Sequence, residues 1–109
     1  MRLYIGGAWQ GQEELARVEN PEREIIPAFH EIIREEVLRC GRDPVEVAER
    51  CIREHPMAAV VSDEVGSGVV PMQAEERRYR EAVGRALCRL AESAESVTRC
   101  VCGIGVRIK

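Results

Sequence analysis

The stretch Gly6-Gly7-Ala8-Trp9-Gln10-Gly11-Gln12-Glu13 decides the fold of this chain. A short apolar run, Leu3-Tyr4-Ile5, precedes it, and a helical pattern follows from Glu14. A strand, a Gly-rich turn and a helix form the frame of a phosphate-binding loop, in which backbone N–H groups and the helix N-terminus surround the phosphates. The sequence therefore predicts that Gly6 to Glu13 are the nucleotide- or phosphate-binding residues.

The side chains that normally complete such a loop are replaced here. A Lys usually reaches the β/γ-phosphates, and a Ser or Thr hydroxyl holds Mg²⁺. Counting from Gly6, the Lys position is Gln12 and the Ser/Thr position is Glu13, whose negative charge lies where phosphate would bind. We expect weak or lost phosphoryl transfer, with residual anion binding and a purely structural turn as equal alternatives. Trp9 either stacks on a ring or covers the loop.

Length and composition bound the class of protein. The chain has 109 residues, which predicts a single α/β domain over 1–109. Its net charge of −3 argues against a nucleic-acid partner, which requires a concentrated basic surface. Apolar runs are too short to span a bilayer, and the N-terminus lacks the layout of a signal peptide, so we expect no membrane partner and a cytoplasmic location.

Five cysteines are scattered along the chain, at Cys40, Cys51, Cys88, Cys100 and Cys102. The odd count and irregular spacing do not indicate a disulfide framework. Cys100 and Cys102 alternate along an expected strand and should share a face, but neither has a partner at zinc spacing. We expect buried, reduced thiols.

Strands and helices are expected to alternate, which predicts an α/β layered fold with a mainly parallel sheet. Beyond the strand at residues 3–5, strands are expected at residues 57–61, 97–102 and 106–108. Helices are expected from Glu14, from Asn20-Pro21-Glu22 with a break near Pro27, from Ala28 to Cys40-Gly41, from Asp43-Pro44 to His55, and over residues 73–94. A Gly-rich loop is expected at Gly66–Pro71.

Polar candidates follow the buried strand that starts at Met57. Val60-Val61 leads into Asp63 and Glu64, and an acidic strand end of this kind can support Mg²⁺ through one or two carboxylates. The alternative is that both acids cap the loop or contact the following helix. The arginines of the 77–89 helix are interpreted as a solvated face balanced by acids, and His30 as a partly buried helix residue.

Several colinear motifs resemble those of one known family. They are Asp63-Glu64-Val65-Gly66-Ser67-Gly68-Val69-Val70-Pro71, then Arg78-Tyr79-Arg80-Glu81, then Gly103-Ile104-Gly105-Val106-Arg107-Ile108-Lys109. They are similar to the corresponding motifs of the adenosylcobinamide kinase / adenosylcobinamide-phosphate guanylyltransferase family. The loop at Gly6 is similar to that family's Gly-Gly-Ala-Arg-Ser-Gly-Lys-Ser. Glu64 matches a family position and is the stronger metal candidate.

The resemblance implies a reduced P-loop NTPase-like three-layer domain that binds GTP or ATP with Mg²⁺, and a corrinoid. It also implies a homo-oligomer, a trimer in the family. Family members are longer, and the difference falls between residues 20 and 57, a portion that normally carries the guanylylated His; neither His30 nor His55 matches it. The chain is therefore interpreted as a cobalamin-biosynthesis homologue with weak or lost catalysis, whose catalytic residues are unknown. The alternatives are a non-catalytic oligomeric binding or regulatory protein, and an enzyme of changed chemistry.

Overall fold

The computed structural model describes residues 1–65 and 73–109. The elements in chain order are β1 (Arg2–Gly6), α1 (Gln12–Glu19), β2 (Ile25–Ile26), α2 (Phe29–Ile33), the π-helix η1 (Arg34–Arg39), α3 (Pro44–Glu54), β3 (Ala59–Asp63), α4 (Ala74–Ser93), β4 (Ser96–Val101) and β5 (Ile104–Arg107). The expected Gly-rich loop at Gly66–Pro71 lies outside the described residues.

The sheet is built around β1. Its strand order is β2-β3-β1-β4-β5, and all neighbours are parallel except β5, which runs antiparallel to β4. Leu3 of β1 is in register with Val60 on one side and with Val97 on the other. The prediction of a mainly parallel sheet is confirmed, and the central strands read as apolar because helices cover both faces.

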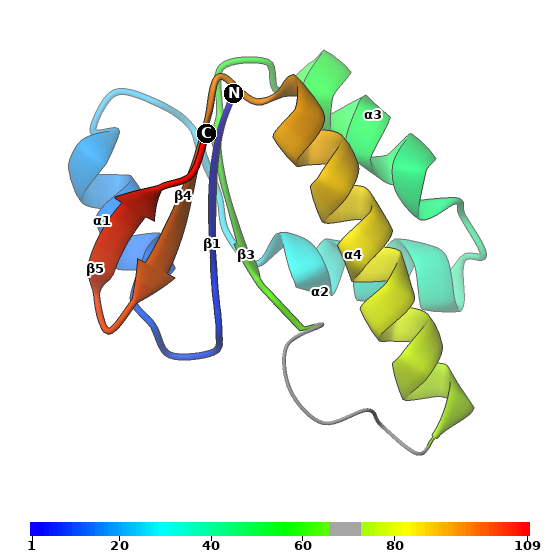
Figure 1. Cartoon of the computed structure of the whole chain (residues 1–109). Coiled ribbons are helices and arrows are strands. Elements are labelled where there is room, and N and C mark those ends of the chain that lie inside the picture. The colour runs from blue at the N-terminus through cyan, green and yellow to red at the C-terminus, as the bar shows by residue number, and fades with distance from the viewer. Residues whose placement is uncertain (66–72) are drawn as a thin grey trace.

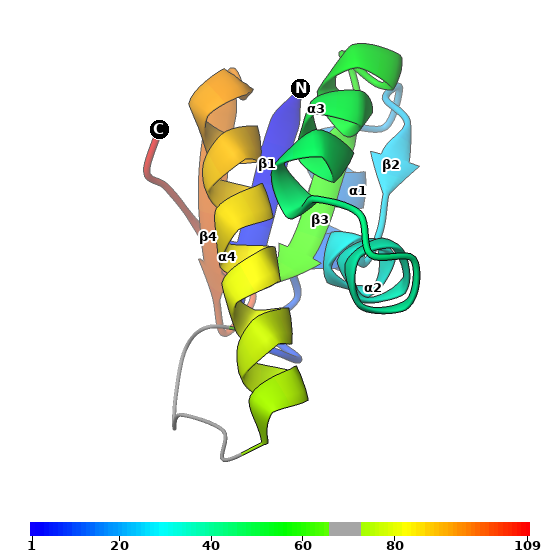
Figure 2. The ribbon, with the colours of Figure 1, turned by 90° about the vertical axis from the view of Figure 1, so that its right-hand side faces the viewer.

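Helices form two layers around the sheet (Figures 1 and 2). On one face, α4, α3 and α2 bury the larger core, whose fully buried side chains include Phe29, Ile33 and Leu90. On the other face α1 packs through Ala16 against Tyr4 and Val61. This arrangement is consistent with the predicted reduced P-loop-like domain. In the described ranges, no helix is long and apolar enough to cross a membrane.

Local signals place most helices correctly. Asp43 caps α3 by accepting a hydrogen bond from the Val45 N–H at 2.9 Å, and Pro44 occupies the first turn. The helix predicted from Ala28 begins at Phe29 and finishes as a π-helix before Cys40, with Gly41 at a positive φ of 71°. The longest helix is α4, as predicted.

The helix start predicted at Asn20-Pro21-Glu22 is wrong. Asn20 ends α1, and after a turn the chain enters the short strand β2. The Asn20 amide donates to the Ala16 carbonyl at 2.8 Å and to the Tyr4 hydroxyl at 2.9 Å, while its oxygen accepts from Arg2 at 2.8 Å. These hydrogen bonds hold Asn20 at the C-terminal end of α1. It therefore cannot serve as the N-cap of a following helix, although its local sequence fits one.

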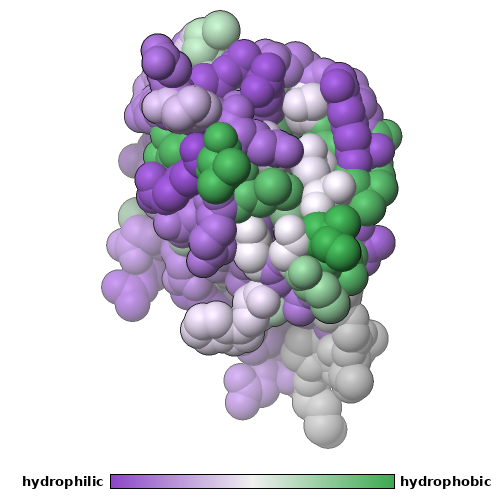
Figure 3. Space-filling view, turned by 90° about the vertical axis from the view of Figure 1, so that its left-hand side faces the viewer, coloured by the Kyte–Doolittle hydropathy of each residue, from purple (hydrophilic) through white to green (hydrophobic). Residues whose placement is uncertain are grey.

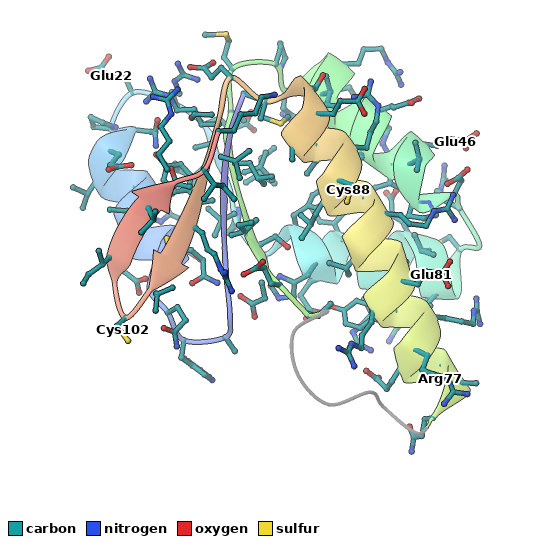
Figure 4. The ribbon with its side chains drawn as sticks, in the orientation of Figure 1. Glu22, Glu46, Arg77, Glu81, Cys88 and Cys102 are labelled. Carbon is teal, nitrogen blue, oxygen red and sulfur yellow. The ribbon has the colours of Figure 1, made fainter. Side chains whose placement is uncertain are left out.

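The cysteine prediction is only partly right. All five thiols are free, but Cys40, Cys88 and Cys102 are exposed, and only Cys51 and Cys100 are buried. Burial raises the pKa of Cys51 to about 11 and raises that of Cys100. The shared face of Cys100 and Cys102 is wrong because β4 ends at Val101, and Cys102 begins a tight turn with a positive φ of 52° (Figure 4).

An ionic cluster around Glu95 lies at the amino-terminal ends of the strands, which is the end of the sheet opposite the loop. The carboxylate accepts hydrogen bonds from Arg23 at 3.1 Å, from the N-terminal amino group at 3.3 Å and from Arg2 at 3.2 Å. Hydrogen bonds from Arg23, then from the amino group and Arg2, lower the pKa of Glu95 to about 2. The cluster links the start of β1, the segment before β2 and the start of β4.

The depressed pKa of Glu95 predicts a pH-dependent contribution to stability. The contribution is present above the ordinary pKa of 4.5 and is lost as the pH falls toward about 2. Glu95→Gln should therefore lower the free energy of unfolding at pH 7, and its difference from the wild type should shrink between pH 5 and pH 2.5. Urea denaturation across that range measures the difference. A difference that does not vary with pH would contradict the prediction.

The role of Asn20 as the end of α1 is tested by Asn20→Ala. The change removes three hydrogen bonds of a buried side chain, and we expect it to cost about 1–3 kcal/mol. Glu22→Ala, at an exposed position two residues on (Figure 4), is the matched control and should stay within about 0.5 kcal/mol of the wild type. Urea denaturation distinguishes them, and equal effects would count against the assignment.

Candidate functional site

The carboxyl ends of three parallel strands meet where β1 ends. Gly6 is in register with Asp63 of β3 and with Cys100 of β4. A Cβ at position 6 would lie 2.7 Å from the Cys100 carbonyl oxygen, so only Gly allows this close approach. Ligands of open α/β sheets bind outside such strand ends, which makes this edge the candidate site.

The loop from Gly7 to Gly11 leaves its N–H groups open. Among the described residues, no acceptor receives a hydrogen bond from the backbone N–H groups of residues 7–13. Gly11 adopts a left-handed conformation with φ 86° at the start of α1, which lets the chain turn directly from the loop into the helix. Open N–H groups at the beginning of a helix are the feature by which such loops bind anions.

Gln12 occupies the place predicted for the catalytic Lys and fills it. Its side chain is buried, and its amide nitrogen donates to the Gly6 carbonyl at 3.3 Å, the Gly7 carbonyl at 3.1 Å and the Asp63 carboxylate at 2.8 Å. Its Oε1 atom is buried without a hydrogen-bond partner in the described structure. Three acceptors around one nitrogen suit an ammonium, which has three N–H donors, better than an amide.

Acidic side chains surround this edge. Glu13 lies in the first turn of α1, and its carboxylate pairs with Arg17 at 3.2 Å. Glu14 and Asp63 line the same cavity as Glu13. The pair with Arg17 is solvent-exposed, so it offsets little of the local negative charge. A polyanion that binds here depends on the backbone N–H groups or on a cation that accompanies it.

His30 lies at this site, a position that its sequence context did not indicate. Its Nδ1 accepts a hydrogen bond from the Asp63 backbone N–H at 3.0 Å, and its Nε2 lies 3.6 Å from the Asp63 carboxylate. The neutral ring therefore carries its hydrogen on Nε2 and presents a donor there. Such a ring can donate to a ligand oxygen, whereas a nucleophile needs a free lone pair. The Tyr79 hydroxyl donates to the His30 carbonyl at 3.2 Å, and burial raises the pKa of Tyr79.

The two metal candidates point to different sides of the sheet. Asp63 faces the loop, where it contacts Gln12 and His30. Glu64 lines a second cavity between the sheet and α4, and its carboxylate pairs with Arg99 at 3.2 Å. No group of three or more potential metal ligands occurs among the described residues. One carboxylate at the loop suits a Mg²⁺ ion that takes its other ligands from water and phosphate.

A cavity of about 670 Å³ lies between the loop, α1 and the start of α2. Its residues include Ala8, Trp9, Leu15, Val18, Ala28 and Val61 on the apolar side, and Gln12, Glu13, Glu14, His30 and Asp63 on the polar side. The volume falls within the range of about 300–1,000 Å³ that is common for ligand pockets. Of the predicted loop residues, Ala8, Trp9, Gly11, Gln12 and Glu13 line the cavity, and Gln10 turns toward β4 and β5.

Within the described parts of the chain, Arg78, Arg85 and Arg89 of α4 make no contact with this site. Arg78 and Arg85 are exposed, and Arg89 pairs with Glu49 of α3 at 3.4 Å. Arg34 of η1, which the sequence did not single out, lies 3.9 Å over the Tyr79 ring and 3.5 Å from Glu76. The exposure of Arg78 and Arg85 agrees with a solvated helix face, whereas the acid that pairs with Arg89 belongs to α3 and not to its own helix.

A family model and two curated relatives that match this chain belong to the same family. A family model described as cobinamide kinase / cobinamide phosphate guanyltransferase matches residues 30–108. The chain is similar to the bifunctional adenosylcobalamin biosynthesis protein CobU of Salmonella typhimurium and to that of Escherichia coli, with 42% and 41% identity over 59 residues. Each alignment covers 54% of this chain and 33% of the relative. The match thus spans a third of the length of these curated relatives.

Substitutions at Gln12 test whether its nitrogen substitutes for an ammonium. Gln12→Leu leaves the Asp63 carboxylate and the loop carbonyls without a donor, and we expect a loss of about 1–3 kcal/mol in the free energy of unfolding. Gln12→Lys should keep or raise stability, because its three donors meet three acceptors and its charge faces Asp63. Urea denaturation measures both. The interpretation fails if Lys destabilises the protein as much as Leu.

Proposed function

The chain belongs to the cobinamide kinase / cobinamide phosphate guanyltransferase family, and on this premise we propose that the cavity beside its loop binds a purine nucleotide, with GTP as the implied ligand. In this proposal the protein is a cobalamin-biosynthesis homologue whose transfer chemistry is weak or lost. The observation that carries the proposal is the row of open N–H groups from Gly7 to Glu13 beside a cavity of about 670 Å³.

Nucleotide binding is supported by the way the loop is kept open. The Gln12 amide holds the Gly6 and Gly7 carbonyls on the protein side of the loop at 3.3 and 3.1 Å. Since the carbonyls are engaged there, the N–H groups of the loop remain for a ligand. Mg²⁺ would be held by Asp63 and the nucleotide phosphates, which supplies the positive charge that the missing Lys does not. A corrinoid is the second ligand class that the family description implies.

Weak or lost transfer is supported by the replaced side chains. Phosphoryl transfer depends on cations placed against the charge that develops in the transition state. Gln12 is neutral, and Glu13 and Glu14 add negative charge at the cavity. His30 presents an N–H donor, so it does not supply the free lone pair that a guanylylated His requires.

A non-catalytic oligomeric protein is the alternative, and one surface favours it. Four large apolar side chains on or beside β4 and β5 are at least half exposed: Val101, Ile104, Val106 and Ile108. Strand β5 is also the edge of the sheet, so its outer backbone groups are free to pair with another chain. Such a strand suits contact with a second copy.

Calorimetric titration of GTP, with and without Mg²⁺ and with ATP as comparison, tests nucleotide binding. We expect micromolar, Mg²⁺-dependent binding of GTP. Gln12→Lys combined with Glu13→Ser should tighten it by roughly tenfold or more, because the pair of changes adds one positive charge and removes one negative charge beside the phosphate site. Gln12→Met with Glu13→Ser is the matched control, because it keeps the length of the side chain without the ammonium.

Two outcomes would contradict parts of the proposal. If calorimetry detects no binding of GTP or ATP at millimolar concentration, the proposed nucleotide site is wrong and the oligomeric alternative is favoured. Product formed from cobinamide and GTP by the wild-type protein would show that transfer chemistry is retained. In that case the loss of the Lys position would have to be compensated elsewhere in the site.

A further inference from the structure

Trp9 stands at the tip of the loop in an unusual state. It is the single Trp of the chain, and 98% of its surface is exposed. Its backbone has a positive φ of 65°, a left-handed conformation that costs free energy for a bulky residue. Exposing a large aromatic ring to water is also unfavourable. Because both costs fall on one residue, we look for the role of Trp9 in contact with a binding partner.

The residue that follows Trp9, Gln10, is anchored by two hydrogen bonds. The Gln10 main-chain oxygen accepts a hydrogen bond from the Gly103 N–H at 2.8 Å, and its side-chain oxygen accepts from the Cys102 N–H at 2.6 Å. Gln10 is thereby fixed to the turn between β4 and β5, at the tip where Figure 4 shows Cys102. The backbone on the C-terminal side of Trp9 is therefore anchored to this turn.

The indole is one of the groups that line the loop cavity. Trp9 lines it together with Leu15 and Val18 of α1, and Val18 is itself 77% exposed. Figure 3 shows this side of the molecule, where apolar surface interrupts a mostly hydrophilic face. Ala8, Gly11, Gln12 and Glu13, whose backbone N–H groups are open, line the same cavity. The cavity is therefore lined both by groups that can bind an anion and by aromatic and apolar side chains.

We propose that Trp9 is the stacking platform for the base of a nucleotide whose phosphates lie on the loop N–H groups. This inference rests on the proposed nucleotide site and names the residue that gives it affinity. The described residues that line the cavity include three acids and no Lys or Arg, so their side chains offer no ionic attraction to a nucleotide. Stacking on an aromatic face supplies affinity that does not depend on charge.

Two observations separate this role from other uses of Trp9. A side chain that covered the loop would be partly buried against it, and an exposed fraction of 98% excludes that arrangement. A strained, exposed ring beside open N–H groups matches the two ends of a nucleotide.

The single Trp makes the test direct. Fluorescence of the wild-type protein is followed during titration with GTP and with inorganic tripolyphosphate, both with Mg²⁺. GTP should quench the indole emission, whereas tripolyphosphate, which has no base, should bind without quenching. By calorimetry, Trp9→Ala should weaken GTP binding roughly 5- to 150-fold and leave tripolyphosphate binding unchanged, and Trp9→Tyr should retain most of the GTP affinity.

Met57→Ala is the control for a general loss of exposed apolar surface. Met57 is 63% exposed and lies before β3, at the opposite edge of the sheet, so its variant should bind GTP as the wild type does. GTP binding without quenching, and with the wild-type affinity in Trp9→Ala, would overturn the stacking role and leave the nucleotide site intact. If neither GTP nor tripolyphosphate gives a heat of binding, both the stacking role of Trp9 and the nucleotide site are wrong. Emission that changes with protein concentration alone would assign Trp9 to contact between copies.

Discussion

The parallel pairing of β1 between β3 and β4 is the constraint on which the rest of the structure depends. Parallel strands place their carboxyl ends at one edge, so Gly6, Asp63 and Cys100 meet there although they are far apart in sequence. The Cys100 carbonyl leaves no room for a side chain on Gly6, and the chain must turn away at once into the loop. The position of Asp63 beside Gln12 and His30 follows from the same register.

Gln12 is a neutral side chain in a place whose three acceptors would suit a charged one. An ammonium at this position would satisfy the Gly6 and Gly7 carbonyls and Asp63 with three equivalent donors. The amide reaches the same three acceptors with two hydrogens and leaves its Oε1 buried without a partner. An unpaired buried oxygen costs free energy, so the pocket around Gln12 fits its present occupant imperfectly. The three acceptors require a hydrogen-bond donor at this place, and the neutral amide supplies one without a charge.

Local sequence signals predicted the elements, and long-range contacts determined what they missed. The apolar run before Asp63, the Asp43-Pro44 start of α3 and the stripe of α4 are local patterns, and each gave the right element. Asn20 has the local sequence of a helix start but ends α1, because Tyr4 and Arg2 reach it across the sheet. His30 carries no motif at all. It enters the site only because α2 packs at the carboxyl end of β3, which no spacing along the chain reveals.

The charge balance of the loop cavity limits what can bind there. The N–H groups of residues 7–13 favour an anion, while Glu13, Glu14 and Asp63 oppose one. Since no Lys or Arg lines the cavity among the described residues, a phosphate ligand would be helped by a cation of its own, most simply Mg²⁺. The remaining affinity must then come from contacts that are indifferent to charge. The exposed Trp9 ring lines the same cavity, so a ligand with both a phosphate group and a flat ring could contact the loop N–H groups and the indole together.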